Sequence, residues 1–422
     1  MNVILTPTKL KGDVIIPPSK SLSHRAIIAA SLASGESKIS NIIYSEDIIA
    51  TIEAMKSLGS KIEMFDDYLI INGSKPKRIG NIINANESGS TIRFMIPIAL
   101  TVNEPVTFDG RNNLVNRPLD IYTNLFDEFG IRYERGEKYL PMKVYDGLKP
   151  GVYKIRGDVS SQFITGLLYA LPLLDGDSKI LITTKLESKG YIDLTMDVLK
   201  KFGIIIETSD YTEFTIKGNQ EYKPLNYTVE GDYSQVAFWA IANTLGNEVN
   251  IKCMNEYSYQ GDKKIIEDIN SFGGNVYFEN GELVSKPSNT HSTVIDFSNS
   301  PDLGPIETVL ACVSKGHTTF NNVERLRIKE CDRVSCMIDE MKKLGASLYE
   351  TENTMEIDGV EKLTSSMDLD SHNDHRIVMA LSIASTICND KIKIHNAGAI
   401  KKSYPHFFKA FEAVGGILEY ED

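Results

Sequence analysis

A repeated unit of about 71 residues constrains this chain more than any other feature of its sequence. An amphipathic segment that ends in an apolar residue and a glycine occurs six times, with the glycines at Gly59, Gly130, Gly203, Gly273, Gly345 and Gly415. Successive glycines are 71, 73, 70, 72 and 70 residues apart. A glycine directly after an amphipathic run is a typical helix C-terminus, because glycine readily adopts the left-handed conformation found there. A fixed period of this length indicates a repeat architecture.

A second family of predicted helices alternates with the first. These segments are apolar nearly all round, so we expect them to be buried on all sides. They read "RAIIAASLA", "TIRFMIPIAL", "QFITGLLYALPLL", "QVAFWAIANTL", "PIETVLACV" and "RIVMALSIAS". A short polar turn and a β-rich run follow each. The sequence therefore predicts an α/β fold of two domains, each with three pseudo-symmetric repeats of strand, buried helix, strand, surface helix and strands.

Composition narrows the class of protein. The 422 residues are 42% hydrophobic, enough for two or more cores, and the net charge of −12 argues against nucleic acid or an acidic membrane as the main partner. The five cysteines are scattered without a CxxC pair, which is typical of a reduced, intracellular protein. The N-terminus lacks a signal-peptide core, and no apolar run approaches 18 residues. We expect a soluble, cytoplasmic protein.

Cationic residues gather at or near the predicted helix starts, where the helix dipole normally favours acids. Eight of them occupy equivalent places in the repeats, namely Lys20, Arg25, Arg93, Arg117, Lys329, Arg333, Arg376 and Lys402. A single such residue could simply pack its stem on the surface with its head in water. Eight in equivalent positions indicate binding sites for a multiply charged anion, because helix N-termini add N–H donors and positive potential.

Eight short motifs carry a resemblance to a known family. They are "PPSKSLSHRA" (17–26), "SGSTIR" (88–93), "NRP" (116–118), "VSSQF" (159–163), "SPD" (300–302), "RIKECDR" (327–333), "NDHR" (373–376) and "KSYP" (402–405). With them the chain resembles, over its full length, the 5-enolpyruvylshikimate-3-phosphate synthases of the enolpyruvyl transferase family. The resemblance implies two inside-out α/β domains that close over substrates in a cleft. One would span 19–229, and the other 1–18 plus 230–422, closed by the N-terminal strand.

The resemblance also implies a reaction: transfer of the enolpyruvyl group of phosphoenolpyruvate to the 5-hydroxyl of shikimate 3-phosphate, with release of phosphate. This is a step of the shikimate pathway to chorismate and the aromatic amino acids. Phosphoenolpyruvate would contact Lys20, Gly89, Arg117, Gln162, Arg333, Arg376 and Lys402. Shikimate 3-phosphate would contact Lys20, Ser21, Arg25, Ser160, Ser161, Gln162, Ser188, Tyr191, Asp302 and Lys329. Arginine forks suit the carboxylate and phosphate of both substrates, and serine hydroxyls donate to phosphate without adding charge.

The resemblance further implies residues for the proton transfers. Asp302 is the candidate base for the 5-hydroxyl, and Glu330 and Lys20 are candidates for protonating the methylene carbon. Two ordinary interpretations stand beside these roles. Asp302 could be a helix cap, and Glu330 could be a first-turn acid that satisfies the helix dipole.

Other functions find less support in the sequence. The sister activity, enolpyruvyl transfer to UDP-N-acetylglucosamine, is disfavoured because "SKSLSHR" and "SSQF" read differently in those enzymes. A non-catalytic anion-binding relative is disfavoured by the joint presence of Lys20, Asp302, Glu330 and His375. We expect neither metal nor cofactor, since "HNDH" offers too few ligands for zinc and no phosphate-binding glycine motif is present. We expect a monomer that acts on small molecules.

Overall fold

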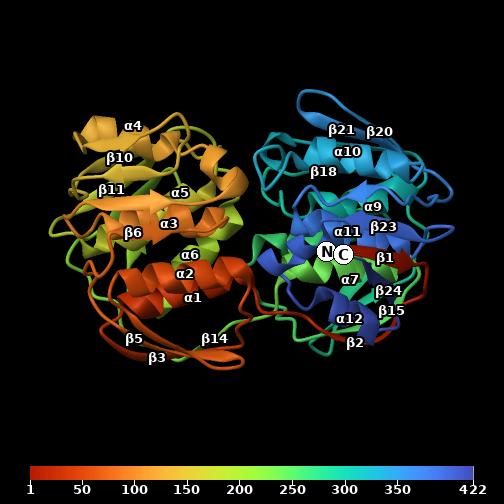
Figure 1. Cartoon of the computed structure of the whole chain (residues 1–422), viewed down its shortest axis with the longest axis horizontal. Coiled ribbons are helices and arrows are strands. Elements are labelled where there is room, and N and C mark those ends of the chain that lie inside the picture. The colour runs from red at the N-terminus through yellow and green to blue at the C-terminus, as the bar shows by residue number, and fades with distance from the viewer. Residues whose placement is uncertain (422) are drawn as a thin grey trace. The chain divides into compact units, whose positions relative to one another are not determined.

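The computed structural model describes residues 1–421 and divides into two compact units (Figure 1). One unit is Lys20–Val229, and the other joins Met1–Ser19 to Glu230–Asp422. The two passages between the units run side by side at Pro18 and Gly231, which form an antiparallel bridge.

Within residues 20–229, three four-stranded sheets share one arrangement. In each, the first two strands are parallel and the later pairs antiparallel. The sheets are, in order, β14 (Tyr227–Thr228), β3 (Gly35–Ser40), β5 (Tyr68–Gly73), β4 (Lys61–Met64); β6 (Ile82–Asn84), β7 (Val106–Asp109), β9 (Met142–Val144), β8 (Tyr133–Arg135); and β10 (Val152–Ile155), β11 (Ser178–Ile182), β13 (Glu213–Ile216), β12 (Ile206–Glu207). Because β14 comes from the end of the unit, the last strand completes the first repeat.

The helices of this unit form a buried set and an outer set. The buried helices are α1 (Lys20–Leu32), α3 (Gly89–Ala99) and α5 (Ser161–Ala170); the outer helices are α2 (Glu46–Ser57), α4 (Asp120–Phe129) and α6 (Lys189–Lys201), with short 3-10 turns η1 (Asn112–Asn116) and η2 (Leu171–Leu173). Nearly every residue of α1, α3 and α5 is buried. The partly exposed ones are Lys20, Ser21, Ser90 and Gln162, all in a first turn. The open ends of the buried helices are therefore their N-termini.

The second unit follows a similar plan, with two strands, β1 and β2, supplied from the N-terminal segment. Its sheets, over residues 1–19 and 230–421, are β18 (Val294–Asp296), β19 (His317–Asn321), β21 (Thr354–Asp358), β20 (Ser347–Glu350); β22 (Leu369–Asp370), β23 (Ile392–His395), β1 (Asn2–Thr6), β24 (Ile417–Glu421); and two pairs, β15 (Glu248–Lys252) with β2 (Lys11–Ile15) and β16 (Asn275–Glu279) with β17 (Glu282–Lys286). Strand β1 takes the third place in its sheet, antiparallel to β23 and β24. The first residues of the chain thus complete its last repeat.

The second unit also has buried and outer helices. The buried ones are α7 (Tyr233–Thr244), α9 (Gly304–Val313) and α11 (His375–Ser385); the outer ones are α8 (Ile265–Ser271), α10 (Arg333–Lys343) and α12 (Phe407–Ala413), with 3-10 turns η3 (Gly261–Lys264), η4 (Glu324–Leu326) and η5 (Ala397–Lys402). Helices α7, α9 and α11 contact one another at the centre of the unit, as Figure 1 shows. The buried helices predicted from the sequence are confirmed in both units.

The repeated glycines occupy the predicted helix ends. Their φ angles are 98°, 64°, 85°, 83°, 82° and 91° in chain order, all in the region where a side chain is strained. Each follows an outer helix directly or by one residue, so the sequence period reflects a backbone requirement.

Two of the eight cations differ in placement from the sequence prediction. Arg117 directly follows η1, and Lys402 is the last residue of η5. Each therefore stands at the end of a short 3-10 turn, a few residues before the outer helix α4 or α12 begins. Among residues 1–421, none of the helices combines the length and the apolar character needed to span a membrane.

Candidate active site

The first turn of α1 presents an ion pair at the open end of its unit. Lys20 is the first residue of α1, and its Nζ lies 2.9 Å from Oδ2 of Asp47 in α2. The two side chains are only 16% and 11% exposed. Asp47 offsets the unfavourable position of Lys20 at the positive end of the helix dipole.

Arg25 is buried one and a half turns further along α1. Its Nε donates to Oγ1 of Thr195 at 2.8 Å, and its Nη2 donates to the carbonyl of Tyr191 at 3.2 Å. The guanidinium also lies 5.3 Å from the ring centre of Phe94 and 6.0 Å from that of Tyr191. Burial lowers the pKa of Arg25 to about 10. A guanidinium held by neutral groups keeps its positive charge largely uncompensated, which suits an anion site.

A hydrogen-bonded chain joins the first turns of α3 and α5. Arg93 donates from Nη1 to Oε1 of Gln162 at 2.7 Å, and Gln162 donates from Nε2 to Oγ of Ser90 at 2.8 Å. Beside this chain the Arg117 guanidinium lies close over Gly89, where an added Cβ would be only 2.6 Å from its Nη1. Glycine at 89 therefore allows Arg117 to approach the N-terminus of α3.

The predicted serine cluster also lies at helix starts. Ser160 caps α5 by accepting a hydrogen bond from the Gln162 amide at 3.3 Å, and Ser161 follows as the first helical residue. Ser188 precedes α6 with φ 54° and ψ 43°, a left-handed conformation uncommon for serine. Tyr191 is in the first turn of α6, so these hydroxyls and this ring belong to adjoining helix ends, since α5 packs on α6.

In the other unit, Asp302 is surrounded by cations. Its carboxylate accepts from Nζ of Lys329, Nη1 of Arg333 and Nη2 of Arg376, each at 3.0 Å. Burial alone would raise the pKa of Asp302, but Arg376, Lys329 and Arg333 outweigh it and hold that pKa well below its ordinary value. Leu303, not Asp302, holds the N-cap position of α9. The structure thus gives Asp302 a charged environment that a simple helix cap would not need.

Arg333 is the centre of a second group of ion pairs. Its side chain is 1% exposed, and its nitrogens contact three carboxylates. Nε donates to Oδ2 of Asp374 at 2.8 Å, Nη2 to Oε2 of Glu330 at 2.8 Å, and Nη1 to Asp302. Asp374 in turn caps α11 by accepting from the Arg376 amide at 2.8 Å. Neighbouring carboxylates thus hold Arg333 and keep the starts of α10 and α11 together.

The remaining two predicted cations lie beside this network. Arg376 donates from Nη2 to Oγ of Ser234, in the first turn of α7, at 3.0 Å. Lys402 is 6% exposed and donates from Nζ to the carbonyl of Asn373 at 2.7 Å. The starts of α7, α9, α10 and α11 therefore meet at one end of this unit.

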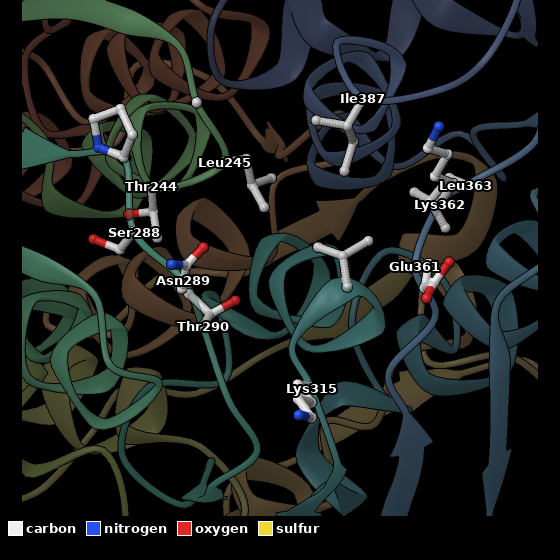
Figure 2. Close-up of a pocket in the computed structure, with 13 residues that line it drawn as sticks. Thr244, Leu245, Ser288, Asn289, Thr290, Lys315, Glu361, Lys362, Leu363 and Ile387 are labelled. Carbon is white, nitrogen blue, oxygen red and sulfur yellow. The ribbon is translucent and has the colours of Figure 1, made fainter.

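A surface hollow lies at the opposite ends of the same helices (Figure 2). It has a volume of about 640 Å³ and is lined by Thr244 at the end of α7, Val313 at the end of α9 and Ile387 just after α11. Lys315 and Glu361 contribute charges to its wall. Because it adjoins the C-termini of the buried helices, it is separate from the predicted site residues of this unit.

Sequence reasoning predicted Asp302 and Glu330 but missed one further acidic residue in each cluster. Asp47 and Asp374, which are ion-paired with Lys20 and Arg333, were not among the predicted site residues. Asp374 stands inside the "NDHR" motif, so its place beside Arg376 was a usable signal. Asp47 had no comparable signal, because it looks like an ordinary first-turn acid of an outer helix. Arg93 was noted as a cation but given no ligand.

Known proteins resemble this chain in sequence and in fold. A sequence profile of the family described as EPSP synthase (3-phosphoshikimate 1-carboxyvinyltransferase) matches residues 4–411. The chain is 51% identical over 422 residues to a 3-phosphoshikimate 1-carboxyvinyltransferase of Clostridium perfringens, covering 99% of each chain. It is 50% identical over 428 residues to the protein of that name from Clostridium novyi, covering 99% of this chain and 98% of the relative.

Two solved structures share the fold. An EPSP synthase from Acinetobacter baumannii matches with a TM-score of 0.81 and 22% identity, over 100% of each chain. The enolpyruvyl transferase NikO from Streptomyces tendae matches with a TM-score of 0.80 and 14% identity, over 100% of this chain and 98% of its own. The predicted α/β fold is confirmed.

Proposed function

The chain belongs to the EPSP synthase family, and we propose that the buried cations of each unit bind the anionic groups of this family's substrates. The reaction is enolpyruvyl transfer from phosphoenolpyruvate to the 5-hydroxyl of shikimate 3-phosphate, with release of phosphate, in aromatic amino acid biosynthesis. Transfer to UDP-N-acetylglucosamine is not favoured.

The observation that carries the proposal is the burial of four cations. Arg333 and Arg376 lie in the first turns of α10 and α11, Arg25 lies further along α1, and Lys402 ends the 3-10 turn η5. Arg25, Arg333, Arg376 and Lys402 are 2%, 1%, 3% and 6% exposed. Burying a cation is costly, and placing it at the positive end of a helix adds to the cost. Multiply charged anions recover this cost, because they accept charge-assisted hydrogen bonds from the cations and from the helix N–H groups.

The ligand assignments follow the predicted sets, taken by unit. For shikimate 3-phosphate we propose Lys20, Ser21, Arg25, Ser160, Ser161, Gln162, Ser188 and Tyr191 in one unit, and Asp302 and Lys329 in the other. For phosphoenolpyruvate we propose Lys20, Gly89, Arg117 and Gln162 in the first, and Arg333, Arg376 and Lys402 in the second. Gln162, held by Arg93 and Ser90, presents its amide in a fixed orientation, which supports a ligand role for it.

Asp302 is the proposed base for the 5-hydroxyl. Three cations keep it ionised, so it is ready to accept a proton, but they also make it a weak base. When substrate phosphate and carboxylate groups contact Lys329, Arg333 and Arg376, the new negative charge offsets these cations. The proton affinity of Asp302 then rises in the complex, where the proton transfer takes place.

Glu330 and Lys20 remain the proposed groups for protonating the methylene carbon. Glu330 accepts from Arg333, and Lys20 pairs with Asp47. Either contact fixes the side chain in one orientation, which a proton transfer to carbon requires. The split between the two can be measured by replacing each separately and following exchange of the methylene hydrogens with solvent deuterium.

Phosphate release tests the function and the base together. The purified protein with phosphoenolpyruvate should release phosphate with shikimate 3-phosphate and not with UDP-N-acetylglucosamine. Asp302→Asn should lower turnover by about 10²–10⁴-fold, the range of a general base, while shikimate 3-phosphate still binds. Near-normal turnover in a folded Asp302→Asn protein would refute the assignment of the base without affecting the family reaction.

We also propose that the enzyme works as a monomer in the cytoplasm. Light scattering coupled to size-exclusion chromatography would measure the mass of the protein in solution. The mass of a dimer would refute the proposal that the enzyme is a monomer.

A further inference from the structure

The turn that joins β22 to α11 has an unusual backbone. His372 and Asn373, in the middle of this turn, have φ angles of 50° and 57°, in the left-handed region. Residues other than glycine are uncommon in that region, and two in succession need support from the surrounding structure. Strained backbone of this kind is often found where a protein places functional groups. Residues 370–374 are called the entry turn below.

The entry turn contributes two acceptor groups to the cations of the proposed site. The carbonyl of Asn373 accepts from Nζ of Lys402 at 2.7 Å. The carboxylate of Asp374 accepts from Nε of Arg333 at 2.8 Å and also caps α11. Lys402 and Arg333 are both buried, so each depends on these contacts for its orientation. The backbone of the turn therefore helps to determine where the two cations lie.

A buried carboxylate holds the first part of the entry turn. The Glu340 side chain, in α10, is 1% exposed. Its Oε1 lies 2.8 Å from Nε2 of His372, and its Oε2 accepts from the amide of Asp370 at 3.0 Å. Lys343 donates to both oxygens at 3.0 Å. Because an ionised carboxylate only accepts, His372 carries a hydrogen on Nε2 in this contact. Burial alone would raise the pKa of Glu340, but these hydrogen bonds hold that pKa below its ordinary value.

Helix α10 thus contacts the entry turn at two points. Arg333 and Glu340 are seven positions apart in α10, which is about two turns of helix, so both side chains reach the same neighbour. Arg333 holds the end of the turn through Asp374, and Glu340 holds its beginning and middle through Asp370 and His372. One of the two points is a proposed phosphoenolpyruvate ligand, and the other lies outside every predicted ligand set.

We propose that Glu340 and His372 are positioning residues for the binding of phosphoenolpyruvate. They hold the entry turn in its left-handed conformation, and its two acceptor groups then orient Lys402 and Arg333. The inference rests on the proposed function, in which these two cations contact phosphoenolpyruvate. Without the contact to Glu340 the turn relaxes toward an ordinary backbone and its acceptor groups move. A misplacement of about 1 Å in a binding group can cost up to about 10²-fold.

The first test is steady-state phosphate release by the full-length Glu340→Gln protein. Glutamine keeps the size of the side chain, but its NH2 group faces hydrogen-bond donors that the carboxylate satisfied. KM for phosphoenolpyruvate should rise at least about tenfold, while KM for shikimate 3-phosphate stays within about twofold. A merely structural role would lower the fraction of active protein, and hence turnover, without separating the two KM values. Equal changes in both KM values would overturn the proposal.

His372→Gly tests the same turn without altering α10, and it decides the result if Glu340→Gln does not fold. The His372 side chain is 33% exposed, and glycine adopts left-handed backbone without strain but has no ring to reach Glu340. Because the Asp370 contact stays, KM for phosphoenolpyruvate should rise by a smaller factor, at least about threefold. An unchanged KM in this folded variant would contradict the role of His372.

His317→Asn is the matched control. His317 also contacts carboxylates of its own unit, Asp358 at 2.8 Å and Glu356 at 2.9 Å, but in exposed strands. Its replacement should leave both KM values unchanged. A selective rise in KM for phosphoenolpyruvate in this control would show that the effect is not specific to the entry turn.

Hydrogen exchange separates this proposal from the assigned reaction. Peptides covering residues 369–376 should exchange their amide hydrogens at least about tenfold faster in Glu340→Gln than in the wild type, and at the wild-type rate in His317→Asn. This comparison holds whatever reaction the protein catalyses. Wild-type exchange in both Glu340→Gln and His372→Gly would refute the support of the turn. Absence of phosphate release by the wild-type protein would instead refute the proposed function and leave the exchange result standing.

Discussion

Lys329 should make the binding of shikimate 3-phosphate depend on pH above neutrality. Its side chain is 20% exposed, and its Nζ donates to Asp302 at 3.0 Å. Burial lowers the pKa of Lys329 to about 8; Asp302 and Glu330 oppose the shift, and Arg333 and Arg325 add to it. Lys329 therefore changes from ammonium to amine as the pH rises through about 8.

The size of the change in affinity for shikimate 3-phosphate follows from that pKa if the proposed contact with the substrate phosphate requires Lys329 in its ammonium form. At pH 7, one unit below this pKa, about nine-tenths of the Lys329 side chains are protonated. At pH 9, one unit above it, about one-tenth are protonated. The affinity for shikimate 3-phosphate should then fall by about tenfold between pH 7 and pH 9, or about 1.4 kcal/mol. The substrate phosphate is already mostly dianionic across this range, so its own ionisation adds little.

Calorimetric titration with shikimate 3-phosphate at pH 7, 8 and 9 measures the effect. Lys329→Arg is the matched control, because an arginine stays charged over the whole range. The variant should bind with nearly the same affinity at all three values. A wild-type affinity that is constant from pH 7 to 9, or one that falls equally in Lys329→Arg, would contradict the reasoning.

Further expectations concern single buried contacts. Arg333→Ala should lower the free energy of unfolding in urea by about 3–5 kcal/mol, because it removes the guanidinium that is ion-paired with the buried Asp374 carboxylate; a loss below about 1 kcal/mol would count against the ion pair. Gly89→Ala places a methyl group 2.6 Å from the Arg117 guanidinium, so KM for phosphoenolpyruvate should rise more than turnover falls, and an unchanged KM would argue against that contact. Burial raises the pKa of Glu307 well above its ordinary 4.5, so the folded protein keeps a proton that the unfolded chain loses. Wild-type stability should therefore fall by up to about 1.4 kcal/mol per pH unit as the pH rises above the ordinary 4.5 of a glutamate, and Glu307→Gln should lack this slope in urea denaturation.

The architecture was predictable because its signals are local. A glycine with positive φ after each outer helix is required by backbone sterics, so it recurs at a fixed period whatever the surrounding sequence. Helices with apolar residues on every side have to be buried, which places them at the centre of each unit. These rules act over a few residues and can be read without knowing which elements meet.

Two of the ion pairs could not be predicted, because they depend on tertiary contacts. Asp47 pairs with Lys20 across 27 positions of the sequence, and Asp374 pairs with Arg333 across 41. Which helix ends meet is set by the packing of whole repeats, and no single repeat contains that information. The 3-10 turn that ends at Lys402 was also missed, since its six residues lie only a few positions before the following helix.

These acids explain why so many cations can stand at helix N-termini. Without a carboxylate among them, the clustered cations Lys329, Arg333 and Arg376 would repel one another, and the folded state would be destabilised. Asp302, with contacts to Lys329, Arg333 and Arg376, relieves that repulsion. It also weakens the binding of any anion at these cations, because the anion has to compete with the Asp302 carboxylate that already contacts them. A singly charged anion gains little from that competition, whereas a ligand with both a phosphate and a carboxylate can engage several cations at once. In the proposed site, the acidic residues thereby stabilise the fold and should favour the doubly anionic substrates of this reaction over simpler anions.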